Sequence, residues 1–170
     1  MKSMVKFGIA AALSAVLVVP AMAQYEKPMN ISVRAGWFMA QGDGKKAEGQ
    51  NWFTMGAELK LKDIPSANPD NLAHWSLSID YYGKGSFANV PVLYNYVGRH
   101  PDFYYSVGAG VGFGKRNTPT GTDSSIDFNY QLSVGKDFNF SGNALFAEFR
   151  YFGNNRNALA GFSLVGGIRF

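Results

Sequence analysis

Cysteine is absent from this chain of 170 residues, histidine occurs only twice, and charged residues make up only 16% of the sequence. The lack of cysteine excludes a disulfide scaffold, thiolate metal sites and cysteine nucleophiles. Two histidines are too few for a histidine-rich metal site, and a mean hydropathy of −0.11 excludes a bundle of transmembrane helices. Aromatic residues and glycine are abundant instead, with 14 Phe, 9 Tyr, 3 Trp and 20 Gly. The length fits one domain.

The first 23 residues have the pattern of a secretory signal peptide. Lys2 and Lys6 give a positively charged start, an apolar run covers residues 7–19, and Ala-Met-Ala at residues 21–23 supplies small side chains for peptidase cleavage. The alternative is a membrane-anchoring helix, but the run is shorter than the roughly 18 apolar residues that such a helix needs. We therefore expect residues 1–23 to be a signal peptide and residues 24–170 to form the folded domain.

The rest of the chain alternates apolar and polar residues with a period of two, and no helical periodicity is sustained. This alternation predicts β-strands, and each segment is close to the roughly 9–11 residues with which a tilted strand crosses a bilayer. Eight strands are expected at residues 30–40, 52–62, 74–83, 88–98, 103–115, 125–136, 144–153 and 158–170. The predicted fold class is all-β, an eight-stranded antiparallel transmembrane β-barrel with up-and-down topology. Pro91 lacks an N–H, so a bulge or a missing ladder bond is expected there.

Aromatic residues on the apolar face are sorted by strand end. If the N-terminus is periplasmic, one group falls at the periplasmic ends of the strands: Trp75, Tyr96, Phe103, Tyr105 and Phe170. A second group falls at the outer ends: Trp37, Phe53, Tyr81, Phe113, Phe128, Tyr130, Tyr151 and Phe162. Mostly small or aliphatic residues lie between them. Two aromatic girdles around an aliphatic band are typical of membrane barrels, whereas a soluble sandwich or lipocalin core has no reason for such sorting. We therefore expect the apolar face to contact lipid.

The chain resembles the small eight-stranded outer-membrane β-barrels of Gram-negative bacteria, the OmpA/OmpX type. Residues 107–113 (VGAGVGF), 147–152 (AEFRYF) and 163–170 (SLVGGIRF) carry the resemblance. It implies location in the outer membrane, and assembly by periplasmic chaperones and the barrel-assembly machinery. The resemblance also implies that Phe170 and Ile168 belong to the C-terminal signal read by the barrel-assembly machinery, although Ile168 is not aromatic. Members of the family serve as structural proteins, adhesins, small pores or lipid-modifying enzymes, so the fold does not determine the task.

Charged residues on the polar face are expected to form a salt-bridge network inside the lumen, because a small barrel is just filled by its side chains and buried charges must be paired. The predicted members are Arg34, Glu58, Lys60, Asp80, Glu148 and Arg150. We interpret the network as a plug, with a gate or a proton path as the alternative. The glycines of residues 103–115 are expected to make room for long side chains opposite, such as Arg150.

Positively charged residues outnumber negative ones in the outer connections. The cations there are Lys45, Lys46, Lys84, Lys115, Arg116 and Arg156. Such a rim is expected to attract the phosphates of lipopolysaccharide. The alternative is ordinary solvated loop charge. Nucleic acid is not an expected partner, because no basic helix is present and the compartment is wrong.

The leading functional hypothesis is a monomeric structural or surface-interaction barrel with roles in envelope integrity or adhesion. The alternatives are a narrow channel for small or apolar solutes and, third, a lipid-modifying enzyme. An enzyme is not expected, because His74 and His100 fall at the periplasmic end, away from lipid of the outer leaflet. No cofactor and no metal are expected.

Overall fold

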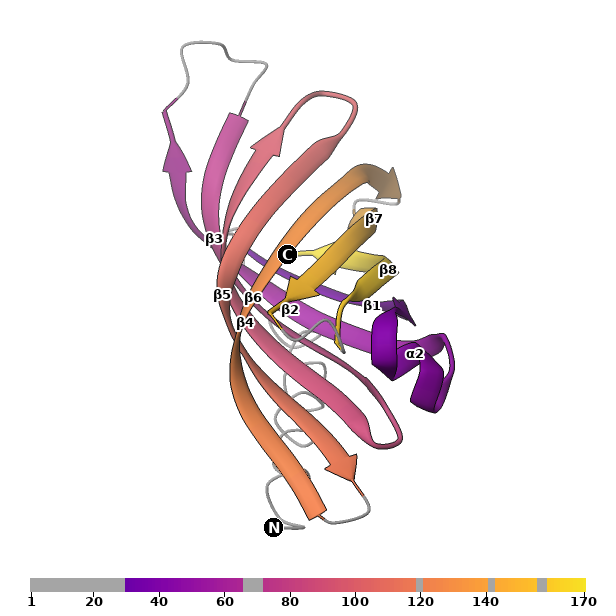
Figure 1. Ribbon diagram of the computed structural model, residues 1–170. Coiled ribbons are helices and arrows are strands. Elements are labelled where there is room, and N and C mark those ends of the chain that lie inside the picture. The colour runs from indigo at the N-terminus through magenta and orange to yellow at the C-terminus, as the bar shows by residue number, and fades with distance from the viewer. Residues whose placement is uncertain (1–29, 66–71, 119–120, 141–142, 156–158) are drawn as a thin grey trace.

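The computed structural model describes residues 30–65, 72–118, 121–140, 143–155 and 159–170, and Figure 1 shows them as a ring of strands. The proposed signal peptide of residues 1–23 and the rim residue Arg156 lie outside this part of the chain.

Eight antiparallel strands form a closed barrel in which each strand pairs with the next one in the chain. Their bounds are β1 Ile31–Ala40, β2 Asn51–Ile64, β3 Leu72–Lys84, β4 Phe87–Arg99, β5 Tyr104–Thr118, β6 Gly121–Phe140, β7 Asn143–Asn154 and β8 Gly161–Arg169. The barrel closes where β1 pairs with β8, with Trp37 opposite Leu164. Closure removes the free sheet edges that lipid would not tolerate. The predicted fold class and up-and-down topology are therefore confirmed.

Two features of the connections differ from the sequence prediction. A short helix, α2 (Gly42–Glu48), follows β1 at one end of the barrel, where only a loop was expected (Figure 1). β6 has 20 residues, so most of the expected connections at residues 116–124 and 137–143 are strand instead. The ladders of β5 with β6 and of β6 with β7 continue to Thr118–Gly121 and Phe140–Asn143. No helix among the described residues has the length and apolar character to cross a membrane.

Two ladders are irregular. The pairing of β3 with β4 is interrupted between Ile79–Val92 and Tyr82–Asn89, with no change of register, and Pro91 lies in this gap. This matches the expectation of a missing ladder bond at the proline. The second irregularity was not predicted: the register of β2 against β3 shifts between Lys60 and Lys62, so one extra residue is accommodated there as a β-bulge.

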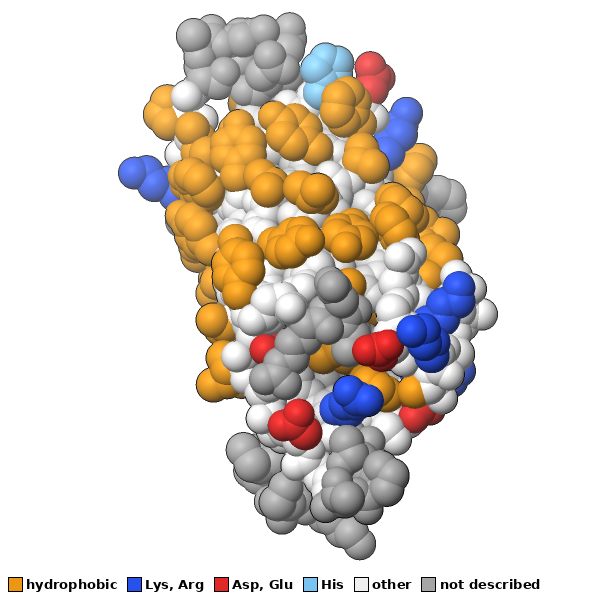
Figure 2. All heavy atoms as spheres, in the orientation of Figure 1, with side chains coloured by type: hydrophobic (Ala, Val, Ile, Leu, Met, Phe, Trp, Pro, Cys, Tyr) orange, Lys and Arg blue, Asp and Glu red, His pale blue; other side chains and the backbone are white. Residues whose placement is uncertain are grey.

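The wall separates apolar from polar side chains as predicted. Trp37 (69% exposed), Phe53, Leu77, Val107, Phe149 and Leu164 all point outward, whereas Asp80, Glu148 and Arg150 are buried inside. Figure 2 shows hydrophobic side chains over the middle of one wall and charged ones towards its two ends. We call the end that carries Ile31 and Phe170 the terminal end, and the end that carries α2 the loop end. An apolar wall of this kind is the surface that lipid favours.

Candidate functional site

The middle of the lumen is filled by an ionic cluster drawn from four strands, β1, β2, β3 and β7. Asp80 on β3 lies between Arg34 on β1 and Arg150 on β7. The Nε and Nη2 atoms of Arg34 donate to the two Asp80 carboxylate oxygens at 2.8 Å each, and Arg150 Nη1 donates to Asp80 Oδ1 at 2.9 Å. All three side chains are 1% exposed. One aspartate therefore joins two buried arginines from different strands.

Two glutamates complete the cluster. Glu58 Oε2 lies 3.2 Å from Arg34 Nη1, and Glu148 Oε1 lies 3.2 Å from Arg150 Nε. Arg150 also donates through Nη2 to Gln131 on the neighbouring strand β6. The buried cations are thus surrounded by carboxylates, the arrangement that offsets the large cost of removing charge from water. The structure brings together Arg34, Glu58, Asp80, Glu148 and Arg150 from the sequence hypothesis.

Lys60 is the exception and requires a correction. It lies towards the terminal end, where its Nζ atom is 2.7 Å from Asp63, and the two side chains are 33% and 74% exposed. Lys60 lies two residues further along β2 than Glu58, closer to the terminal end, and pairs there with Asp63, which follows the β-bulge, so it does not belong to the central cluster.

The wall opposite the ionic cluster carries neutral amides and hydroxyls. Gln131 Nε2 donates to Asn95 Oδ1 at 2.6 Å, Asn95 Nδ2 donates to Ser78 Oγ at 3.0 Å, and Asn89 Nδ2 donates to Asn129 Oδ1 at 2.8 Å. These side chains are buried and form a hydrogen-bonded lining from β3 to β6. These hydrogen-bonded amides fill space in the lumen without adding charge.

The glycines of β5 make room for this amide lining. A Cβ atom at Gly108 would lie 1.8 Å from Asn95 Oδ1, and one at Gly112 would lie 2.1 Å from Asn129 Nδ2. The sequence analysis expected these glycines to accommodate long side chains such as Arg150. The structure instead assigns the space to asparagines on the two neighbouring strands.

An aromatic layer lies between the ionic cluster and the loop end. Phe38 and Tyr82 stack with ring centroids 4.1 Å apart, and Phe152 lies 5.2 Å from Tyr82. The Tyr82 hydroxyl donates to the Leu159 carbonyl at 2.8 Å and accepts a bond from Asn89 Nδ2 at 2.7 Å. The buried cluster, here called the aromatic layer, consists of Phe38, Ala40, Trp52, Tyr82, Phe87, Leu93, Phe152 and Leu159.

The sequence analysis missed the aromatic layer, although the sequence carries a signal for it. Aromatic residues occur as adjacent pairs at four strand ends: Trp37-Phe38, Trp52-Phe53, Tyr81-Tyr82 and Tyr151-Phe152. Since neighbours in a strand point to opposite faces, each pair places one ring in the outer girdle and the other in the lumen. Each buried member, such as Trp52 or Tyr82, belongs to the aromatic layer.

A smaller polar and aromatic cluster lies at the terminal end of the lumen. Asp137 accepts from both Arg99 and Arg169, the latter at 3.0 Å. The Arg169 guanidinium lies 4.7 Å from the Tyr104 ring centroid and 4.4 Å from that of Phe146. Cation–π contacts of this kind add to the ion pairs. The lumen is thus occupied by side chains at both ends as well as in its middle.

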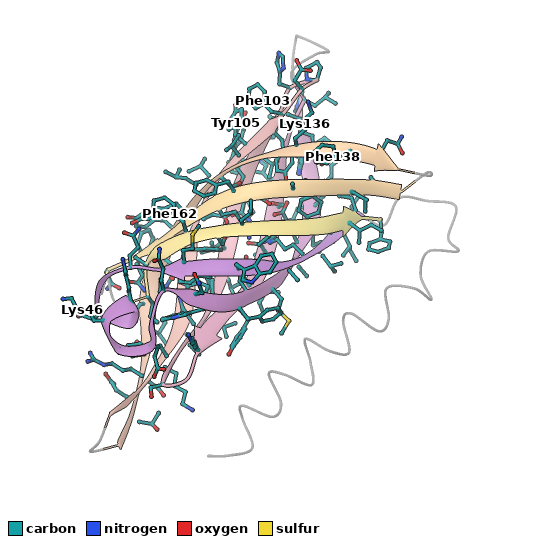
Figure 3. The ribbon with its side chains drawn as sticks, turned by 90° about the vertical axis from the view of Figure 1, so that its right-hand side faces the viewer. Lys46, Phe103, Tyr105, Lys136, Phe138 and Phe162 are labelled. Atoms are coloured by element: carbon teal, nitrogen blue, oxygen red, sulfur yellow. The ribbon has the colours of Figure 1, made fainter. Side chains whose placement is uncertain are left out.

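Cations surround the loop end at the positions that the sequence analysis singled out. Lys45 and Lys46 project from the exposed face of α2, and Figure 3 shows Lys46 at this end of the molecule. Lys46 is 3.4 Å from Asp43, and both side chains are largely exposed. Arg116 lies 5.5 Å above the Phe87 ring. Lys84 ends β3, and Lys115 lines a cavity of about 280 Å³ beside Arg116, Asp43 and Asp123.

The residues of the expected assembly signal lie at the terminal end. The N–H of Phe170 donates to the carbonyl of Ile31 at 2.8 Å, and Ile168 on β8 pairs with Val33 and Leu145. The histidines lie at this end too: His74 is buried on β3, and His100 stacks on Phe103 in the turn after β4. Within the described residues no group of three or more His, Asp or Glu side chains could hold a metal ion.

A closed ring of eight strands with an apolar, aromatic-girdled exterior and a polar lumen is an outer-membrane β-barrel. No protein-family model matches the chain, and no curated protein matches its sequence.

Among solved structures, the chain is similar to the N-terminal β-barrel domain of Pseudomonas aeruginosa OprF, with a TM-score of 0.50 and 13% identity over 85% of this chain and 100% of that one. It is also similar to Ail, the attachment invasion locus protein of Yersinia pestis, with a TM-score of 0.50 and 18% identity over 82% of this chain and 95% of that one. The outer membrane enzyme PagL gives a TM-score of 0.47 and 17% identity over 82% of this chain and 99% of that one. At these identities, the similarity to the OprF domain and to the Ail crystal structure shows a shared fold.

Proposed function

We propose that this protein is a structural and surface-interaction barrel of the bacterial outer membrane, with a closed lumen and a cationic loop end that contacts lipopolysaccharide. The observation that carries the proposal is the filled lumen. Arg34, Asp80 and Arg150 are joined across its middle, and the aromatic layer lies between them and the loop end.

The filled lumen argues against a pathway for ions. An ion crossing the middle would have to displace the bonds that Asp80 makes to both arginines, which lie in a region where an unpaired charge is costly. At the loop end it would then meet the stacked rings of Phe38 and Tyr82. A barrel of this kind supports the membrane and presents its connections outside it.

The loop end supports an interaction with anionic lipid. Lys45 and Lys46 are exposed on α2, and Arg116 is exposed on β5. Clustered cations at a membrane surface attract phosphates, with about 1 kcal/mol for each Lys or Arg near the surface. Lipopolysaccharide carries phosphates at the outer face of the membrane, so it is the anion that these side chains would meet first.

The closed lumen is tested by planar-bilayer recording on the reconstituted protein. We expect no steady conductance above that of the protein-free bilayer. Stable single-channel steps that appear at each insertion would contradict the closed lumen and favour the narrow channel.

The lipopolysaccharide contact is tested with charge-matched variants in nanodiscs of zwitterionic lipid. The double substitution Lys45→Gln/Lys46→Gln removes two loop-end charges, and Lys60→Gln/Lys136→Gln removes two charges towards the terminal end. We expect only the first pair to weaken lipopolysaccharide binding, by about 30-fold if each of the two lysines contributes about 1 kcal/mol. Equal losses of lipopolysaccharide binding in both pairs would mean that the binding depends only on net charge.

The structural role is tested with a deletion strain. An unchanged permeability of its envelope would contradict this role.

A further inference from the structure

The lipid-facing wall of β3 to β6 contains a shallow apolar groove of about 380 Å³. Ala109 on β5 lines the groove and pairs with Tyr94 on one side and Tyr130 on the other. Trp75 stacks on Tyr94 with ring centroids 5.0 Å apart and closes one side of the groove. A small residue between large rings makes the depression.

The register of the strands connects this groove to a lysine. Lys62 on β2 pairs with Trp75, Trp75 pairs with Tyr96, and Tyr96 pairs with Val107, which lies on the groove floor next to Ala109. Adjacent strands are about 4.8 Å apart, so three strand spacings separate Lys62 from Val107 by about 14 Å. A continuous row of side chains on the lipid-facing wall therefore begins with a cation and ends in the groove.

The β-bulge accounts for the outward direction of Lys62. By simple alternation, Lys62 would share the lumen face with Glu58 and Lys60. The register shift between Lys60 and Lys62 places it opposite Trp75, on the outer wall, where it is exposed. Within the described part of the chain, Lys62 forms no ion pair, whereas Lys60 contacts Asp63. Bulges at barrel rims often re-aim a side chain in this way.

We propose that this row is a binding site for one phospholipid of the membrane leaflet at the terminal end. The lipid phosphate pairs with Lys62, its glycerol region packs against Trp75, and one acyl chain follows Tyr96 into the groove at Ala109. A cation at headgroup level and an apolar, aromatic-edged groove within the hydrocarbon match the two parts of a phospholipid. Lipopolysaccharide is the less suitable occupant, because Lys62 lies at the end opposite the cationic rim. The site depends on the barrel lying in a membrane but not on the lumen being closed.

The test is native mass spectrometry of the mature protein, reconstituted in vesicles of phosphatidylethanolamine with phosphatidylglycerol and then transferred to mild detergent. We expect one phosphatidylglycerol molecule to remain bound. Ala109→Phe fills the groove and should abolish this adduct, and Lys62→Gln should weaken it about fivefold, the effect of one lysine near an anionic lipid surface. Lys62→Arg keeps the cation and should retain the lipid.

Two matched controls separate a site from general lipid attraction. Ala35→Phe adds the same ring to an exposed alanine on β1, and Lys136→Gln removes an exposed cation on β6 near Phe103 and Tyr105, as Figure 3 shows. Both should retain the adduct at the wild-type level. No retained lipid in the wild type, or equal losses in Lys62→Gln and Lys136→Gln, would overturn the proposal. Circular dichroism of each variant establishes that the barrel is folded, and planar-bilayer conductance tests the closed lumen separately.

Discussion

The lumen of this barrel is filled by one chemistry in its middle and by another towards the loop end. In the middle, Asp80 holds Arg34 and Arg150 through directed, charged hydrogen bonds. Towards the loop end, Phe38 and Tyr82 stack within a layer of aromatic and aliphatic side chains. The side chains of both layers are buried, but the two layers depend on their members in different ways.

An ionic cluster is sensitive to the loss of one member, because the remaining partner is left as a buried, unpaired charge. An aromatic layer loses contacts in proportion to the atoms removed, and its neighbours relax partly into the space. The stability of the barrel should therefore depend on Asp80 more than its small side chain suggests, because Asp80 lies between two buried arginines. The predictions below follow from this contrast, and all use urea unfolding of the folded barrel in lipid vesicles.

Asp80→Ala should give the largest loss. It removes the acceptor shared by Arg34 and Arg150, all three of which are about 1% exposed. Breaking a buried ion pair by removing one partner costs about 3–5 kcal/mol, so the free energy of unfolding should fall by that amount. A loss below about 1 kcal/mol, typical of exposed pairs, would mean that water screens the cluster, and the lumen would then be better described as a hydrated pore.

Glu58→Ala should cost less than Asp80→Ala. Arg34 keeps both of its bonds to Asp80 when Glu58 is removed, and the Glu58 side chain is already 10% exposed. The loss is then one charge-assisted hydrogen bond, worth about 1.5–3 kcal/mol. If Glu58→Ala proved more damaging than Asp80→Ala, Asp80 would not be the centre of the cluster.

Tyr82→Phe tests the aromatic layer without disturbing its packing. The ring still stacks on Phe38, but the hydroxyl bonds to the Leu159 carbonyl and Asn89 are lost. We expect a loss of about 1 kcal/mol, the typical net contribution of a neutral hydrogen bond. The neighbouring Tyr81→Phe is the control, because this ring belongs to the outer face of the same strand. Equal effects at the two positions would contradict a specific role for the inner hydroxyl.

The alternation of residues in sequence was sufficient to predict the eight strands and their faces. Residues such as Leu77 and Phe149 lie outside, and Asp80 and Glu148 lie inside, because lipid rejects unpaired charge. Closure also follows from sequence once the strands are counted, since β1 and β8 have no other partner in a membrane. Arg34 and Glu58 could be placed side by side because their strands are consecutive.

Other features of the lumen depend on three-dimensional distances that the alternation does not contain. Asp80 lies on β3 and reaches Arg150 on β7 across the barrel, so only the diameter and stagger of the closed barrel determine their contact. The bulge after Lys60 has no marker in sequence, and it changes the face of every later residue on β2. The buried rings of Trp52 and Phe152 were overlooked because apolar residues were assigned to the lipid side alone.

The exposed pair Lys46–Asp43 provides the smallest expected effect. Lys46 Nζ lies 3.4 Å from Asp43 Oδ1 on α2. The Lys46 side chain is 80% exposed and that of Asp43 is 59% exposed, so solvent competes with the contact. Lys46→Ala should change the free energy of unfolding by no more than about 0–1 kcal/mol.

Glu48→Ala is the informative comparison on the same helix, because Glu48 Oε1 accepts the Ser86 N–H at 2.9 Å and so joins α2 to the turn between β3 and β4. A larger loss for Glu48→Ala than for Lys46→Ala would show that contact with the barrel rim, and not charge alone, holds α2 in place, whereas equal losses would contradict that connection.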